Sequence, residues 1–287
     1  MSAPRARRSR SRSRTRGRQR RNTGSDLLLR VLVAIPAVAY AIFIIASGGW
    51  VFTIGILVLG LVCLHELFRM YDPVRPIKLA AFVGLTGLAL AAQEGSERQV
   101  LLALVAFVPL MFLLGVAMPR DEGPSLTAAM SLTTFGVVWV GMAIAHAVLL
   151  RELPHGGGLV VAVLLGTFIG DTGAYLGGRL FGTRKLAPRI SPNKTWEGLI
   201  AGVLFATFAV WWYGLSSEWM GGRNGAILGV AIALAAPLGD LLESAVKRDA
   251  GAKDAGAMFG AHGGALDRLD AAFFTLVTGY YVWLALL

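Results

Sequence analysis

Residues 225–270 read GAILGVAIALAAPLGDLLESAVKRDAGAKDAGAMFGAHGGALDRLD. The first half, 225–246, is a run of apolar and small residues, about as long as a helix needs to cross the ~30 Å hydrocarbon core of a bilayer. The second half is dense in charge and glycine. Charges beside membrane-spanning helices are costly to bury, so a cluster of them needs a chemical reason. The stretch therefore predicts a membrane helix that ends at a polar site.

The rest of the chain repeats the apolar half of this pattern. Of its 287 residues 55% are hydrophobic, and the mean hydropathy is +0.64. Eight further apolar segments are 27–47, 49–68, 77–93, 98–117, 129–150, 157–177, 197–216 and 270–287. Long runs without strict alternation favour helices over a barrel. We expect an all-α, polytopic transmembrane bundle of about nine helices, in which the single Cys63 is a small core residue.

The N-terminus is a separate region. Residues 1–21 hold ten arginines and no acidic residue, so 1–24 is expected to be a disordered Arg/Ser-rich cytoplasmic tail. Its charge is consistent with a topology signal, with contact to anionic lipid heads or with nucleic-acid binding. We favour the topology signal and expect no nucleic-acid partner. Residues 25–150 would form the N-terminal transmembrane helices, and 151–287 the C-terminal region that carries the chemistry.

The distribution of basic residues predicts the orientation. With the N-terminus in the cytoplasm and nine spans, 24 of the 27 Lys and Arg residues fall in cytoplasmic segments, and only Arg98, Arg151 and Arg223 fall outside. Cytoplasmic loops of membrane proteins carry such an excess. The sequence thus predicts a cytoplasmic N-terminus, with both polar clusters described next on the cytoplasmic side of the cell (inner) membrane.

The first polar cluster spans the end of 225–246 and the following loop. Asp240, Glu243 or Ser244, and Lys247 follow at helical spacing and form one polar stripe. Carboxylates suit a hard divalent cation, and lysine and arginine suit phosphate oxygens. Further candidate positions in the cluster are Arg248, Lys253, Asp254, His262, Gly263, Gly264, Asp267, Arg268 and Asp270. Because glycine has no Cβ, Gly263 and Gly264 are expected to let the backbone approach a ligand.

The second polar cluster is 170–198, GDTGAYLGGRLFGTRKLAPRISPNKTWEG. Asp171 and Tyr175 share one helix face. The glycines at 177, 178 and 182 are expected to break the helix and open a cytoplasmic loop. The end of this loop offers hydroxyl, amide and ammonium groups just before a helix N-terminus, a favourable place for an anion: Ser191, Asn193, Lys194 and Thr195.

Both clusters resemble the signatures of phosphatidate cytidylyltransferases (CDP-diacylglycerol synthases). That family has Ser, two residues, Lys-Arg, four residues, Lys-Asp, a gap, His-Gly-Gly, two residues and Asp-Arg-x-Asp, which Ser244 to Asp270 match. It also has a Gly-Asp-x-x-Ala-Tyr-x-x-Gly run before a Ser-Pro-x-Lys-Thr-x-Glu-Gly loop. Ala265 departs from the pattern, since the family usually has a larger aliphatic residue there. The resemblance covers roughly 160–287, while 27–150 agrees only in hydropathy.

The resemblance implies the reaction of CTP with phosphatidate to give CDP-diacylglycerol and pyrophosphate, in phospholipid biosynthesis. It implies that Asp240 and Asp267 hold Mg²⁺, with Asp171, Asp254 and Asp270 as second-rank ligands or orienting groups. A second cation, such as K⁺, and a homodimer are implied too. Catalytic roles fall to Lys247, Lys253 and His262 besides the two aspartates. Substrate contacts fall to Asp171, Ser191, Asn193, Lys194, Thr195, Ser244, Arg248, Gly263, Gly264 and Arg268.

Two other functions remain open. A CTP-dependent lipid or polyprenol kinase would use similar metal and phosphate groups, and a secondary transporter would bind ions at intramembrane carboxylates. The Ser244–Asp270 signature argues against the kinase, and the absence of a repeated half argues against the transporter. The pair His65-Glu66, at the end of the second apolar segment, is interpreted as an interfacial anchor.

Overall fold

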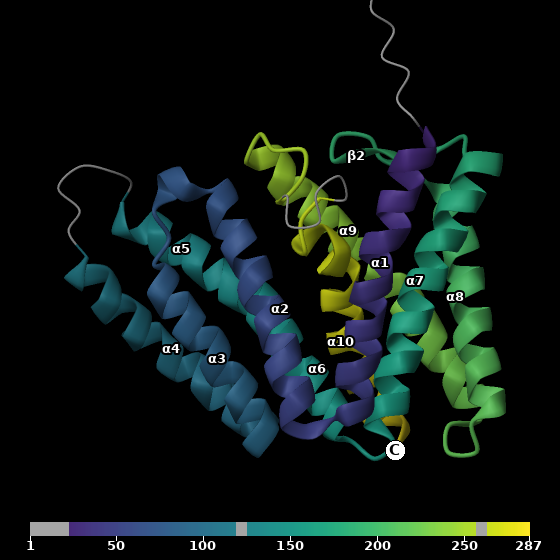
Figure 1. Cartoon of the computed structure of the whole chain (residues 1–287), viewed down its shortest axis with the longest axis horizontal. Helices are drawn as coiled ribbons and strands as arrows, with labels where there is room; N and C mark the ends of the chain where they lie inside the picture. The colour runs from purple at the N-terminus through teal and green to yellow at the C-terminus, as the bar shows by residue number, and fades with distance from the viewer. Residues whose placement is uncertain (1–22, 119–124, 257–262) are drawn as a thin grey trace, which may run out of the picture.

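The computed structural model describes residues 23–118, 125–256 and 263–287, with side chains from residue 35 onward. These residues form a helical bundle with one small hairpin (Figure 1). The elements are α1 Thr23–Ser47, α2 Gly49–Met70, η1 Asp72–Val74, α3 Lys78–Glu94, α4 Glu97–Ala117, α5 Leu126–Gly136, η2 Val137–Gly141, α6 Met142–Glu152, α7 Gly156–Phe181, β1 Lys185–Ala187, β2 Ser191–Thr195, α8 Trp196–Ser216, α9 Gly221–Asp249 and α10 Leu266–Leu286. The prediction of an all-α, polytopic bundle is confirmed for this part of the chain.

Each of the nine predicted apolar segments coincides with a helix. Seven helical stretches in the described ranges are long and apolar enough to cross a membrane. Six are the single helices α2, α4, α7, α8, α9 and α10, and the seventh is the continuous stretch Leu126–Glu152, which comprises α5, η2 and α6. Helix α3 is shorter, at 17 residues. In α1 the described apolar part is Ile35–Ser47. Seven spans are thus supported by length and composition, and the count of about nine stays a prediction.

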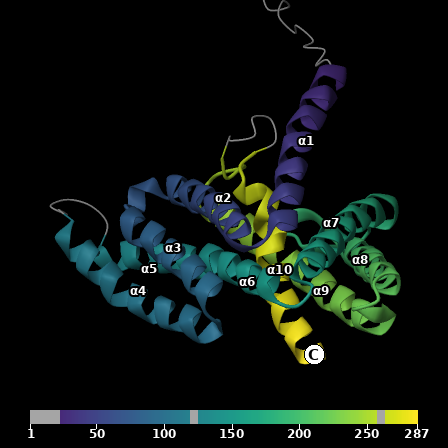
Figure 2. The same ribbon diagram turned by 60° about the horizontal axis from the view of Figure 1, so that its bottom comes forward.

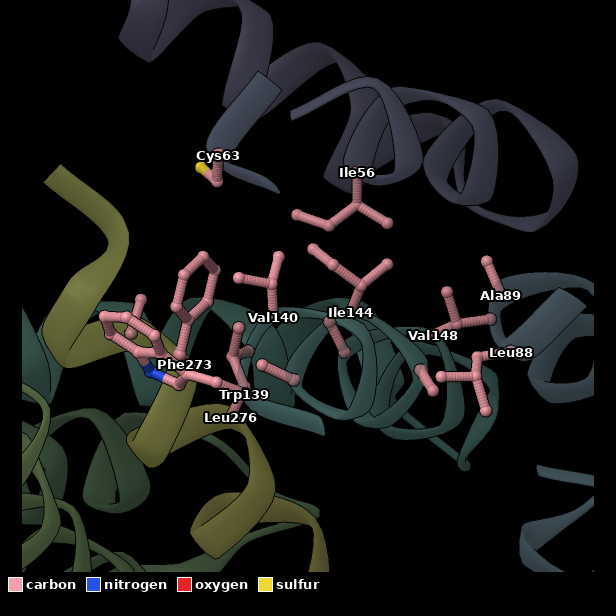
Figure 3. Packing of buried hydrophobic residues seen from close by; sticks show 14 of the residues in the cluster. Ile56, Cys63, Leu88, Ala89, Trp139, Val140, Ile144, Val148, Phe273 and Leu276 are labelled. Carbon is pink, nitrogen blue, oxygen red and sulfur yellow. The ribbon is translucent and has the colours of Figure 1, made fainter. Parts of the chain in front are cut away.

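The core lies where α2, α3, α6 and α10 meet. Figure 3 shows Ile56 and Cys63 of α2 facing Val140 and Ile144, while Leu88 of α3 and Phe273 of α10 close the sides of the same cluster. Cys63 is fully buried, in agreement with its expected role as a core residue. The run from α5 to α6 contains a π-helical segment, η2, whose side chains at Val137, Trp139 and Val140 are buried in this core.

The elements that carry the polar clusters lie at one end of the bundle. In Figure 1 the start of α1, the hairpin β1–β2 and the end of α9 all lie at the top, and the C-terminus lies at the opposite end. Seen from another direction, α7, α8 and α9 group together on one side of α10, and α2 to α6 lie on the other (Figure 2). The charge distribution predicts that these segments lie on the same side of the membrane.

The segment between α7 and α8 differs from its prediction. Gly177 and Gly178 do not break the helix, because α7 continues to Phe181. A Cβ at Gly177 would collide with Ala201 of α8, so this glycine allows two helices to pack closely. The following residues form antiparallel strands rather than an open loop, with Lys185 opposite Thr195 and Ala187 opposite Ser191.

Candidate active site

A cavity of about 570 Å³ lies between α7, β2, α8 and α9. Its size is in the ~300–1,000 Å³ range usual for small-molecule sites. Most of its wall is apolar or glycine, from Gly166 and Gly170 of α7 to Pro237 of α9. Six predicted site residues line it: Asp171, Ser191, Asn193, Lys194, Thr195 and Asp240. The fold thus brings together polar groups from both clusters, up to 69 positions apart in sequence.

Small residues shape this cavity because they let α7 and α8 approach closely beside it. A Cβ on Gly170 would lie 3.1 Å from the Ala206 Cβ, and one on Gly202 would lie 3.0 Å from the Gly170 carbonyl oxygen. Contacts of this kind are tighter than ordinary van der Waals contact, so larger side chains would separate the helices. Thr195 then begins α8 as its N-cap, accepting a hydrogen bond from the Gly198 amide at 3.1 Å. The hydroxyl of Thr195 therefore has a structural partner besides facing the cavity.

The strongest polar contact in the cavity joins β2 to α9. The Lys194 ammonium donates to Asp240 Oδ2 at 2.7 Å, and both side chains are about one quarter exposed. Because the pair is partly withdrawn from water, its attraction is screened less than that of a surface pair. It holds the predicted anion-binding lysine against the predicted metal-binding aspartate.

A second close approach places α10 beside this pair. A Cβ on Gly239 would lie 2.9 Å from the Ala271 Cα and nearer still to the Asp270 carbonyl oxygen. Only glycine allows the two backbones to cross so tightly at the residue next to Asp240. As a result the Asp270 carboxyl group, which is 7% exposed, lies within hydrogen-bond reach of Asp240.

The third contact is a buried ionic cluster one turn further along α9. The Lys247 ammonium binds Glu243 Oε2 at 2.6 Å and Asp267 Oδ1 at 2.8 Å, which links α9 to α10. Asp267 also accepts hydrogen bonds from the backbone amides of Ala255, at 2.9 Å, and Gly264, at 2.7 Å. The carboxylate of Asp267 thereby organises the connection between the two helices.

The double glycine of the signature has a role in this cluster. Gly263 has φ +82°, a left-handed conformation that L side chains rarely adopt, and a Cβ there would lie 2.6 Å from Asp267 Oδ2. The predicted approach of this backbone to a ligand stays a prediction. In the described residues the approaching group is a carboxylate of the chain itself.

These carboxylates fit a divalent cation in composition. Asp171, Asp240, Glu243, Asp267 and Asp270 outnumber the two lysines paired with them, Lys194 and Lys247. Glu243 Oε1 is buried without a hydrogen-bond partner. Within the described ranges, no three acidic, histidine or cysteine side chains converge on one point. Mg²⁺ is usually held by one or two carboxylates plus waters and substrate phosphates, and its assignment to these residues stays a prediction.

Several predicted residues lie away from the cavity. Arg248, Lys253 and Asp254 are exposed at the end of α9 and in the connection that follows it, and Arg268 is exposed on the first turn of α10. Ser244 is partly buried on α9. His262 lies outside the described residues, as does the predicted tail through residue 22.

Two residues near the cavity were not predicted from the sequence: Arg179 and Glu197. Arg179 lines the cavity, and its guanidinium contacts the Tyr175 hydroxyl at 3.3 Å. Its position eight residues after Asp171, on the same face of α7, was the available signal. Glu197 accepts hydrogen bonds from the Thr183 hydroxyl at 2.7 Å and from the Arg184 amide, and so secures the turn into β1.

Comparison with known proteins adds independent findings. Residues 28–286 match the sequence profile described as "Cytidylyltransferase family". A Mycobacterium bovis protein named "Phosphatidate cytidylyltransferase" is 33% identical over 89% of this chain and 83% of its own length. A Haemophilus influenzae protein of the same name is 30% identical over 85% of this chain and 93% of its own length. A Mycobacterium leprae protein, also so named, is 39% identical, but that match spans 52% of this chain and 48% of the relative.

Proposed function

The chain belongs to the cytidylyltransferase family, and from this premise we propose that the cavity and the adjoining carboxylates form its active site. The reaction is transfer of the cytidylyl group of CTP to phosphatidate, which gives CDP-diacylglycerol and pyrophosphate. One observation carries the site assignment: the cavity between α7, α8 and α9 is lined by residues of both predicted clusters and ends at Asp240, beside Asp270.

The chemistry requires two anions to approach each other. A phosphate oxygen of phosphatidate attacks the α-phosphorus of CTP, the bond to the β-phosphate oxygen breaks, and pyrophosphate leaves with the electron pair. The nucleophile is already ionised, so a strong general base is not needed. Positioning and neutralisation of charge therefore account for most of the catalysis.

In this proposal the two lysine side chains exchange their carboxylate partners for phosphate groups of the substrates. In the described arrangement Lys194 and Lys247 are held by carboxylates. An arriving polyphosphate competes with Asp240 for Lys194, and Lys247 is available to a second phosphate in the same way. Arg179 of α7, which also lines the cavity, is suited to a bidentate phosphate contact.

The carboxylates freed by that exchange are the proposed cation ligands. We assign Asp240 and Asp267 to Mg²⁺, with Asp270 next in line because it contacts Asp240, and with Asp171 at the cavity wall. Asp254 is exposed and adjacent to Ala255, whose amide donates to Asp267, and it is kept as an orienting group in this assignment. When bound, the cation would supply positive charge that stabilises the departing pyrophosphate. A second cation such as K⁺ is kept as part of the proposal.

The surroundings of the site follow from the lipid substrate. The chain is a multi-pass membrane protein by the length and composition of its helices. We propose that the end with the hairpin faces the cytoplasm, where CTP is found, and that the membrane is the cell (inner) membrane. Phosphatidate then keeps its acyl chains in the bilayer while its head group enters the cavity lined by α7, β2, α8 and α9. A homodimer is proposed on the resemblance alone.

The test uses purified protein in micelles of detergent and anionic lipid, with phosphatidate, Mg²⁺ and CTP labelled at the α-phosphate. Label should enter the lipid phase with equimolar pyrophosphate. Asp240→Asn and Asp267→Asn should each lower kcat by ~100-fold or more, the scale of losing one electrostatic contact to the transition state. Asp72→Asn is the matched control, because Asp72 pairs with Lys78 at the surface, outside the cavity.

Three outcomes would contradict the proposal. Near-normal activity of either aspartate variant would remove that residue from the site. Label retained in released CDP would indicate the kinase reaction instead. Full turnover after removal of divalent cations with a chelator would exclude the Mg²⁺ assignment while leaving cytidylyl transfer intact.

A further inference from the structure

Glu66 is a buried carboxylate outside the two signature clusters. It lies near the end of α2, is 6% exposed, and reaches α10, 200 positions away in sequence. The interpretation of Glu66 as an interfacial anchor is therefore wrong: its side chain points into the bundle toward α10. The reason is that α2 packs against α10, which turns this face of the helix inward.

The Glu66 side chain caps the first turn of α10. Its Oε2 accepts a hydrogen bond from the Leu266 amide at 2.9 Å, and the Ala265 amide also bonds to the carboxylate. The first amides of any helix lack partners within the helix, and a negative charge there is favoured by the helix dipole. No side chain of α10 or of the residue before it caps this end. Glu66 takes that role from another helix.

The signature loop is built to admit this carboxylate. A Cβ on Gly256 or on Gly264 would lie 2.6 Å from the Glu66 Cδ. Both glycines lie in the connection between α9 and α10, and Gly264 also donates its amide to Asp267. The space left by the two missing side chains is filled by Glu66.

The same end of α2 has a second attachment. The Tyr71 hydroxyl donates to the Val246 carbonyl oxygen at 2.8 Å, next to Lys247 on α9. Helix α2 thus holds both catalytic helices, α9 through Tyr71 and α10 through Glu66.

We propose that Glu66 is a positioning residue, which fixes the start of α10 and thereby places the carboxylates of Asp267 and Asp270. Asp267 lies one residue, and Asp270 four residues, after the amide that Glu66 holds. Without that contact the first turn of α10 loses its cap, and Asp267 loses the fixed Gly264 amide beside it. The proposal rests on the active site assigned above, and it gives the N-terminal half of the chain a role in the reaction.

The experiment compares Glu66→Ala and Glu66→Gln with a matched control, Glu97→Ala. Glu97 is also a carboxylate of the N-terminal half that binds α10, but it accepts the Tyr280 hydroxyl at 2.8 Å, near the other end of that helix. Three readouts are used: kcat and the KM for CTP, thermal unfolding, and hydrogen–deuterium exchange of the 263–270 backbone amides.

We expect Glu66→Ala to lower kcat by ~10–100-fold, the scale of a small misplacement of catalytic groups, and to accelerate exchange in 263–270. In Glu66→Gln the loss of kcat and the acceleration of exchange should both be smaller, because the glutamine amide oxygen still accepts one hydrogen bond. Glu97→Ala should lower the unfolding temperature, but it should change neither kcat nor the exchange of the 263–270 amides. If Glu66→Ala does not fold, Glu66→Gln carries the test.

A folded Glu66 variant with wild-type kcat and unchanged exchange in 263–270 would overturn the proposal. An equal loss of kcat in Glu97→Ala would reduce Glu66 to a general packing contact. These failures are distinct from failure of the site itself, which would appear as full activity in Asp240→Asn or Asp267→Asn. If those two variants are inactive while Glu66→Ala is normal, the site stands and the positioning role falls.

Discussion

The closest approach of α9 and α10, at Gly239, predicts a loss of activity from a single added methyl group. In Gly239→Ala the new Cβ would lie 2.9 Å from the Ala271 Cα, about 0.5 Å short of ordinary contact at 3.4 Å. The obstructing atoms are backbone, so no side chain can rotate away. The helices must separate by at least that amount, directly beside Asp240 and Asp270.

Two magnitudes follow. Overpacking of this kind costs about 1–3 kcal/mol in the free energy of unfolding. Because a misplacement near 1 Å can lower a rate by ~100-fold, a shift of half that size or more should lower kcat by ~10–100-fold. That loss corresponds to about 1.4–2.8 kcal/mol of transition-state stabilisation.

The assay is CDP-diacylglycerol formation by purified protein, paired with thermal unfolding in the same detergent. Gly87→Ala is the matched control, since Gly87 lies within α3 and a Cβ there meets nothing within 4 Å. Alanine should stabilise that helix by about 0.5–1 kcal/mol and leave kcat unchanged. A folded Gly239→Ala protein with wild-type kcat would refute the claim that this crossing sets the spacing of the two aspartates.

Three further predictions concern the cavity and its supports. Lys194→Gln should raise the KM for CTP and lower kcat, whereas Lys185→Gln, on the exposed partner strand, should leave steady-state kinetics unchanged. Arg179→Ala should raise the KM of one substrate by ~10-fold, because it removes a guanidinium–phosphate contact; a tenfold change in affinity corresponds to ~1.4 kcal/mol. Arg184→Ala is the control, since Arg184 is outside the cavity lining. Tyr71→Phe should lower the free energy of unfolding by about 1 kcal/mol, the usual value of one hydrogen bond, as measured by thermal unfolding, with kcat altered less than in a Glu66 variant.

The bundle was predictable because hydropathy alone marks helices that must satisfy their backbone polar groups in lipid. All nine apolar segments coincide with helices, and the short link at Gly48 separates α1 from α2 as expected. The polar stripe Asp240, Glu243 and Lys247 was visible at helical spacing, because i, i+3 and i+4 positions share a face whatever the tertiary structure.

The details that the sequence did not reveal depend on contacts between distant helices. Nothing near Glu66 in the chain signals that its carboxylate reaches the start of α10. Gly177 looked like a helix breaker because local propensity says so, but tight packing against Ala201 overrides that propensity. The strand pairing of Ser191–Thr195 with Lys185–Ala187 is likewise set by a short return of the chain, not by a strong strand pattern.

The spacing of Glu243 and Lys247 also bears on how the protein enters the membrane. The two residues are four positions apart on α9 and pair within that helix. An unpaired charge costs about 2.5–3.5 kcal/mol at the centre of a membrane helix, and these two residues lie in the last two turns of α9, where a lysine side chain can also reach the interface. Because the pair needs no other segment, α9 can be inserted with these charges already matched, before α10 has been synthesised. Asp267 then joins Lys247 when α10 arrives. The ionic cluster of the proposed active site can therefore form during synthesis, first the pair Glu243–Lys247 within α9 and then the contact of Lys247 with Asp267 of α10.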